Sequence, residues 1–127
     1  MPRNMSYALT TQQIMDEDKE VTRRLGWWNS KPGEIVNACK KCMGLKKGEK
    51  VRRLKLIEFT NIRMEPLNDI TDEDLIKEGF PDWTRCQFMR FFLESHKGKW
   101  KMFHDWGCFR PVNRIGFKYI QPQTKVA

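Results

Sequence analysis

Apolar and polar residues alternate near both ends of the chain, and this pattern is typical of β-strands. The first alternating stretch covers residues 4–9, and the last covers residues 114–119. Further extended stretches are expected between them, at residues 19–25, 34–39 and 50–64. In the longest of these, the apolar positions change parity between Leu56 and Ile57, which predicts a bulge or a strand buried on both faces.

Helix-forming segments lie between the predicted strands. A short helix is expected to open at Thr10, and a longer one runs from Thr71, through an acidic first turn, to Gly79. A third helix is predicted to begin at Thr84, because Gln87 three positions later completes a capping box. Its phenylalanines recur at helical spacing, which predicts a face directed at the core.

The order of these elements favours one fold class. Strands at both ends, with helices inserted between them, predict an α+β fold built on a small, largely antiparallel β-barrel. A chain of 127 residues has room for one domain of ordinary size. We therefore expect a single domain over residues 1–127, with its core at about residues 5–120 and a flexible tail at residues 121–127.

Composition argues against several classes of protein. Apolar residues make up 39% of the chain and aromatic residues 12%, which argues against disorder along its whole length. No stretch is long and apolar enough to cross a membrane, and the N-terminus lacks the apolar core of a secretory signal. Four cysteines are too few for a secreted disulfide scaffold. We therefore expect a cytoplasmic protein with reduced thiols and no membrane partner.

The net charge of +8 is unevenly distributed along the chain. Residues 23–55 contain 11 basic and 2 acidic residues, a net charge of +9, whereas residues 58–82 contain 2 basic and 8 acidic residues, a net charge of −6. A dense positive field attracts polyanions, and nucleic acid is the commonest one inside cells. The candidate contacts in the densest stretch are Lys40, Lys41, Lys46, Lys47, Lys50 and Arg52. The alternative is that these charges keep a strand edge soluble.

Two adjacent tryptophans form a further candidate contact. Trp27 and Trp28 follow Arg23 and Arg24, so that bases could stack on the indoles while the guanidinium groups bind phosphate. The alternative interpretation places one indole in the core and the other over an end of the barrel. The sequence leaves both interpretations open.

Cys39 and Cys42, with His104 and Cys108 further along, have the residue types of a Cys3His zinc site. No second close pair of cysteines is present, and positions 39 and 42 face opposite ways if the strand continues through them. We therefore expect buried thiols rather than a metal site, and the sequence predicts no cofactor.

A longer pattern of residues points to a known family. It consists of the segment Ala8-Leu9-Thr10-Thr11-Gln12-Gln13-Ile14, the motif Lys19-x-x-Thr22-Arg23-Arg24, the turn Lys31-Pro32-Gly33-Glu34, and the helix from Ile70-Thr71 to Glu78-Gly79-Phe80. In this pattern, over about residues 5–120, the chain resembles ASCH-domain proteins, and it looks closest to the versions found in bacteriophages and prophages. The resemblance implies a PUA-like β-barrel and a role linked to RNA binding and RNA metabolism.

The resemblance also implies a cleft sized for a base or a nucleoside and lined by the Lys-x-x-Thr segment. Some small ASCH proteins are amidohydrolases that deacetylate N4-acetylcytidine with a Lys, a Thr and a Glu, and others are reported as ribonucleases. These three residues fall on Lys19, Thr22 and Glu78 here, and the basic residue two after the Thr falls on Arg24. The implied roles are base for Lys19, nucleophile for Thr22 and acid for Glu78.

Such a triad is chemically reasonable. A threonine hydroxyl needs a base to take its proton, and a desolvated lysine near other cations has a lowered pKa. The alternative is a structural cluster in which Thr22 bonds the backbone and Lys19 pairs with Glu78. We expect a nucleic-acid-associated protein that binds RNA or a modified nucleoside in a basic cleft, with an amidohydrolase or a ribonuclease as the alternative.

Overall fold

The structure, a computed structural model, describes residues 3–41, 47–96 and 111–121. Within these residues the chain forms five strands, three α-helices and one short 3-10 helix. In chain order they are β1 (Arg3–Ser6), α1 (Thr11–Met15), β2 (Val21–Arg24), β3 (Ile35–Cys39), β4 (Arg53–Pro66), the 3-10 helix η1 (Leu67–Asp69), α2 (Asp72–Lys77), α3 (Arg85–Ser95) and β5 (Pro111–Ile120).

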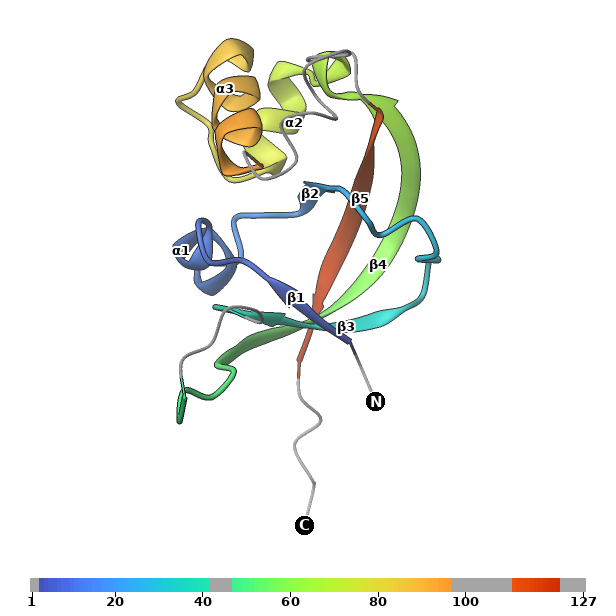
Figure 1. The fold of residues 1–127 in the computed structure, drawn as a ribbon. Coiled ribbons are helices and arrows are strands. Elements are labelled where there is room, and N and C mark those ends of the chain that lie inside the picture. Colours follow the sequence, from blue (N-terminus) through green and yellow to red (C-terminus); the bar gives the residue numbers. More distant parts are fainter. Residues whose placement is uncertain (1–2, 42–46, 97–110, 122–127) are drawn as a thin grey trace.

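The strands form one mixed sheet in the order β1-β3-β4-β5-β2. β1 pairs with β3 in parallel, and the other three pairings are antiparallel. The sheet curls, and its longest strand, β4, bends along its length (Figure 1). The α+β class and the antiparallel character of most of the sheet are thus confirmed.

The sheet does not close, so the expectation of a barrel is wrong in this respect. Its edge strands, β1 and β2, have four residues each and form no ladder with one another in the described chain. Side chains occupy the space between them instead. The Arg24 guanidinium lies 4.5 Å from the centroid of the Tyr7 ring and donates a hydrogen bond to the backbone oxygen of Ser6. The opening between the two edges is therefore built from polar and aromatic side chains.

β4 changes its register at two places, neither of which is the predicted one at Leu56 and Ile57. One shift, against β3, lies beside Leu54, and the other, against β5, lies between Phe59 and Asn61. The second shift brings Asn61 against Gly116, where an added Cβ would lie 2.6 Å from the Asn61 amide nitrogen. A larger residue at position 116 would require the Asn61 side chain to move.

Buried apolar side chains gather in two clusters. The larger one joins β1, α1, β3, β4 and β5, and it includes the fully buried Ile14, Ile57 and Phe59. The second joins η1, α2 and α3 with Val112 of β5. Each large side chain in these clusters contributes about 1.5–3 kcal/mol through burial. β5 contributes to both clusters and so connects the helices to the sheet.

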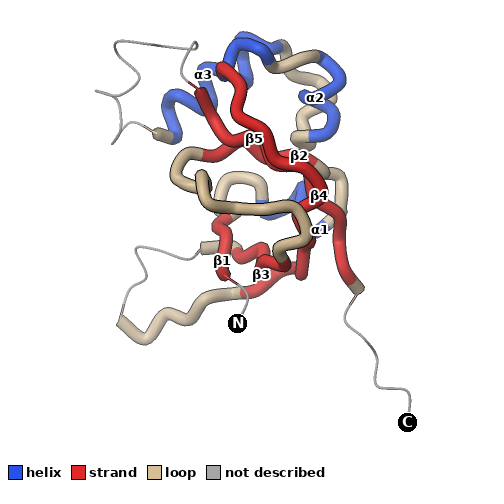
Figure 2. The backbone as a smooth tube through the Cα atoms, turned by 90° about the vertical axis from the view of Figure 1, so that its right-hand side faces the viewer, coloured by secondary structure: helices blue, strands red, loops and turns tan. Residues whose placement is uncertain are grey.

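The helices lie where the capping signals predict them. Thr84 and Gln87 make both bonds of the capping box, at 3.1 Å and 2.7 Å. α2 and α3 lie together at one end of the sheet, whereas the described residues of the connection between β3 and β4 (40–41 and 47–52) lie at the other end (Figures 1 and 2). No helix of the described residues has the length and apolar character needed to cross a membrane.

Candidate functional site

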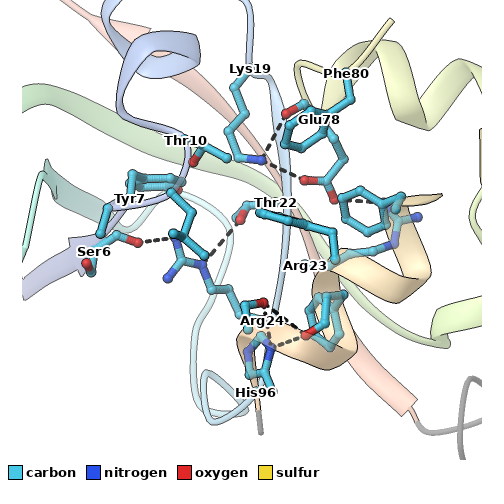
Figure 3. A pocket seen from close by; sticks show the side chains of 16 residues that line it. Ser6, Tyr7, Thr10, Lys19, Thr22, Arg23, Arg24, Glu78, Phe80 and His96 are labelled. Carbon is cyan, nitrogen blue, oxygen red and sulfur yellow. Dashed lines mark hydrogen bonds and ion pairs between the residues drawn. The ribbon is translucent and has the colours of Figure 1, made fainter. Parts of the chain in front are cut away.

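A cleft of about 280 Å³ opens between the two edges of the sheet. It is lined by the end of β1 and residues 7–10 after it, by Lys19 and residues 22–24 of β2, by residues 78 and 80 at the end of α2, and by α3 with His96 (Figure 3). The failure of β1 and β2 to pair thus leaves a space that a closed barrel would fill with a ladder. This volume is close to the lower limit of small-molecule sites.

The helical side of the cleft is aromatic. Phe80, Phe91, Phe92 and His96 all line it. The ring of Phe80 packs against that of Phe91, with centroids 5.5 Å apart, and the ring of Phe92 stacks on that of His96 at 4.2 Å. The helical spacing of the phenylalanines, which predicted a core-facing surface, therefore places part of that surface along a cleft.

The sheet side of the cleft is polar, and Lys19 contacts Glu78 there. Lys19 Nζ lies 2.7 Å from Glu78 Oε1 and 3.0 Å from the Glu78 backbone oxygen. Both side chains are almost completely buried, with exposed fractions of 4% and 1%. Burial lowers the pKa of Lys19, and the nearby Glu78 carboxylate opposes that shift.

The end of α2 places Glu78 for this contact. Glu78 is the C-cap of α2, and Gly79 follows with a φ of 93°, in the left-handed region. A Cβ at position 79 would lie 2.6 Å from Gln13 Cγ, so the turn packs directly on α1. The Glu-Gly pair at the end of the acidic helix is therefore the local reason why the carboxylate reaches the cleft.

Arg23 connects this pair to a larger network of buried ions behind the cleft. Its guanidinium contacts the carboxylates of Glu78 at 3.0 Å, Asp74 at 2.5 Å and Glu65 at 2.9 Å. Asp74 also receives two hydrogen bonds from Arg114, at 2.8 Å and 2.9 Å. Hydrogen bonds from Arg114 and then from Arg23 hold the pKa of Asp74 well below its usual range.

Thr22 and Arg24 form the outer part of the polar side. Arg24 Nε donates to Thr22 Oγ1 at 3.2 Å, while the Arg24 guanidinium covers the face of Tyr7 (Figure 3). Burial raises the pKa of Tyr7 to about 12. Arg24 is thus fixed on three sides, by a hydroxyl, a backbone oxygen and an aromatic ring.

The predicted triad is therefore gathered in one cleft. Lys19 and Glu78 are in direct contact, and Thr22 lines the same space. Lys19 comes before the first residue of β2, so strand alternation does not separate it from Thr22. The hydroxyl of Thr22 is bonded to Arg24 rather than to the backbone, and its described hydrogen bonds do not include Lys19.

The other predicted nucleic-acid contacts lie apart from the cleft. Lys40, Lys41, Lys47, Lys50 and Arg52 belong to the connection between β3 and β4, at the far end of the sheet from α2 and α3 (Figure 1). Lys46 lies outside the described residues. The structure thus separates the densest positive charge from the cleft.

The two tryptophans do not line the cleft either. Trp27 packs on the core with its ring at 76° to that of Phe59, and the guanidinium of Arg3 lies 4.3 Å from its ring centroid. Trp28 is 46% exposed. One indole therefore packs on the core, as the alternative interpretation of the two tryptophans predicts, and the other is accessible.

Cys39 is a buried thiol that donates to the backbone oxygen of Asn37 at 3.5 Å. Cys42, His104 and Cys108 lie outside the described residues, as does most of the predicted tail. Within the described chain, no group of three or more His, Cys, Asp or Glu residues is placed to hold a metal ion.

Several residues of the site carry weak signals in the sequence. Asp74 fits the acidic first turn that a helix dipole favours, yet it is buried against two arginines. Arg114 occupies a polar position of an alternating strand, and it is buried because α2 covers that face. Tyr7 alternates like any core residue. Only a hypothesis that pairs an arginine at a polar strand position with an acid of the helix could have indicated these contacts from the sequence.

The fold has relatives among solved structures. It is similar to the crystal structure of protein EF3133 from Enterococcus faecalis V583, described as DUF984, with a TM-score of 0.62 and 16% identity over 94% of this chain and 77% of that chain. It is also similar to an ASCH domain from Lactobacillus crispatus JV V101, with a TM-score of 0.59 and 14% identity over 92% and 78%. These likenesses show a shared fold. The sequence matches no family model and no curated protein.

Proposed function

We propose that this protein binds a base or nucleoside of RNA, or a free modified nucleoside, in the cleft between β1 and β2. The observation that supports this most is the two-sided lining of the cleft. The helical side offers aromatic surface for stacking, and the sheet side offers donors and acceptors for a heterocycle. The volume suits one base with its sugar, and the ASCH-like fold is consistent with an RNA-associated role.

The basic connection between β3 and β4 supports RNA as the larger ligand. Its lysines and arginine are exposed or half-buried, and the described ones form a single ion pair, Lys41 with Glu49 at 3.5 Å. Free cations of this kind bind phosphates in a salt-dependent manner. We infer that they attract the RNA strand, while the cleft selects a base.

A fluorescence titration with short single-stranded RNAs tests this proposal. Affinity should fall as salt rises, and Phe91→Ala should weaken binding by about 1–3 kcal/mol, the usual effect of removing a stacking ring. Arg90→Gln is the matched control, since Arg90 is exposed on α3 and does not line the cleft. Equal affinities of the wild type and Phe91→Ala would overturn the use of this cleft.

A second function is favoured by the contact between Lys19 and Glu78. These residues and Thr22 match the positions of the amidohydrolase triad implied by the ASCH resemblance, and they line one cleft. The lowered pKa of Lys19 suits a base, and the hydrogen bond from Arg24 would stabilise negative charge that develops on Thr22 Oγ1. Proton transfer from Thr22 to Lys19 requires the ammonium to be deprotonated first and to move toward the hydroxyl.

Chromatography of N4-acetylcytidine incubated with the protein tests the second function. Conversion to cytidine by the wild type, but not by Lys19→Met, Thr22→Val or Glu78→Gln, would establish the triad as catalytic. The three variants replace side chains by others of similar volume, and their thermal unfolding shows whether each still folds. Absence of conversion by a folded wild type would remove the deacetylase and leave the binding function.

A further inference from the structure

Among the described cations in and behind the cleft, every one but Arg24 contacts a carboxylate. Three buried cations and three carboxylates form a network of ion pairs, and these six residues are Lys19, Arg23, Arg114, Glu65, Asp74 and Glu78. The exposed Arg63 adds one further pair, with Glu65 at 2.7 Å. Arg24 lines the cleft as well, but no acidic side chain of the described residues pairs with it. In the part of the chain that the structure describes, the positive charge of Arg24 therefore has no carboxylate partner.

Arg24 is nevertheless held firmly. Nε donates to Thr22 Oγ1, Nη2 donates to the backbone oxygen of Ser6, and the guanidinium plane lies over Tyr7 (Figure 3). A guanidinium has five N–H donors, and these two bonds use only Nε and Nη2, which leaves donors for a ligand. Such a fixed fork is suited to bind an anionic oxygen without first losing side-chain entropy.

We propose that Arg24 receives a phosphate group of the ligand, so that the cleft takes nucleotides in preference to neutral nucleosides. This inference rests on the proposed binding function and specifies its ligand class. The base stacks on the aromatic side of the cleft, and the phosphate neutralises the single free cation. Neither Lys19 nor Arg23 can serve in its place, because their charges are already paired with carboxylates.

The phosphate comes from a free nucleotide or from an RNA strand, and both present the same anionic oxygens. A mononucleotide and a short oligonucleotide of the same base distinguish these sources. If a mononucleotide is the ligand, the trinucleotide should bind no better than it. If a strand is the ligand, the trinucleotide should bind tighter, because its other phosphates reach further cations.

Calorimetric titration of the wild type with pairs of ligands, each a nucleoside and its monophosphate, tests the inference without any variant. Each of the four ribonucleosides is compared with its 5′- and 3′-monophosphate, so that any preference for a base cancels. At least one phosphate form should bind at least about tenfold tighter than its nucleoside, as a charge-assisted bond to arginine predicts. Equal affinities for every pair would overturn the inference while leaving base binding in place. No binding of any ligand, oligonucleotides included, would overturn the proposed binding function as well.

Variants of Arg24 sharpen the test. Arg24→Gln should abolish the difference between nucleotide and nucleoside, and Arg24→Lys should restore part of it because the charge returns without the fork. Arg90→Gln removes the same charge from outside the cleft and should change nothing. Thermal unfolding of each variant checks the fold. An unchanged phosphate preference in folded Arg24→Gln would assign the anion to another residue.

Discussion

Two regions of this protein are rich in basic residues, and they differ in almost every physical respect. In the network around Arg23, three buried cations contact three carboxylates, and the side chains of these six residues are at most 10% exposed. Only the exposed Arg63 joins these described residues from outside, through Glu65. The connection between β3 and β4 has cations that are mostly exposed and one described ion pair. Both regions contribute to the same +9 segment of the sequence.

The comparison shows that a local count of charge does not locate a binding site. A buried cation must have a partner because desolvation is costly, so its charge is cancelled where it stands. An exposed cation keeps its field and is screened only by salt. The network therefore shapes the cleft, whereas the connection supplies long-range attraction.

The largest difference between the two regions is expected in stability. Arg23→Met leaves three carboxylates with one cation fewer, and breaking a buried ion network from one side costs about 3–5 kcal/mol. Urea unfolding measures this loss. Arg90→Met, at an exposed site, should change the free energy of unfolding by no more than about 0.5 kcal/mol. A loss for Arg23→Met as small as that of its control would contradict the structural role of the network.

The network should also make stability depend on pH at the acid end. The pKa of Asp74 is depressed in the folded state, so the unfolded chain takes up the proton first as the pH falls. Its stabilisation is complete above the unfolded pKa of about 4 and is lost progressively below it. Urea unfolding from pH 6 to pH 2, at about constant ionic strength, measures the decline.

Asp74→Asn serves as the comparison for this pH dependence. The amide cannot titrate, so its stability should be lower than that of the wild type at pH 6 and should fall less between pH 4 and pH 2. Parallel curves for the two proteins would mean that other carboxylates cause the acid response.

The sequence predicts the features that depend on neighbouring residues, but it does not predict those that depend on contacts between distant parts of the chain. Capping residues and alternation located the helices and strands, since these signals act within a few residues. Closure of the sheet could not be predicted, because it depends on whether two short edges meet after the whole sheet has curled. The resemblance brought Lys19, Thr22 and Glu78 together, whereas Asp74 and Arg114 became visible only once α2 lay against β5.

Substitution of the exposed cations between β3 and β4 should lower the affinity for RNA without lowering stability. A variant with glutamine at Lys40, Lys47, Lys50 and Arg52 should fold as stably as the wild type, because these side chains are exposed. Its binding to single-stranded RNA should weaken and should depend less on salt, with the slope of log K against log salt smaller by about 0.7 for each phosphate that the variant no longer binds. Filter binding over a range of salt gives this slope. An unchanged slope would remove the connection from the RNA surface.

The smallest expected effect is the difference in coupling energy between two ion pairs of the same chemistry. Lys41 with Glu49 and Lys19 with Glu78 are both lysine–glutamate pairs, but the first is about 40% exposed and the second is buried. Double-mutant cycles with methionine for each lysine and glutamine for each glutamate measure their coupling. The exposed pair should give less than about 1 kcal/mol and vanish in high salt, because water and ions screen it. The buried pair should couple several times more strongly and keep its coupling in salt, since no ions reach it. Equal coupling energies would mean that the network around Lys19 is hydrated, and that its cations remain available to a ligand alongside Arg24.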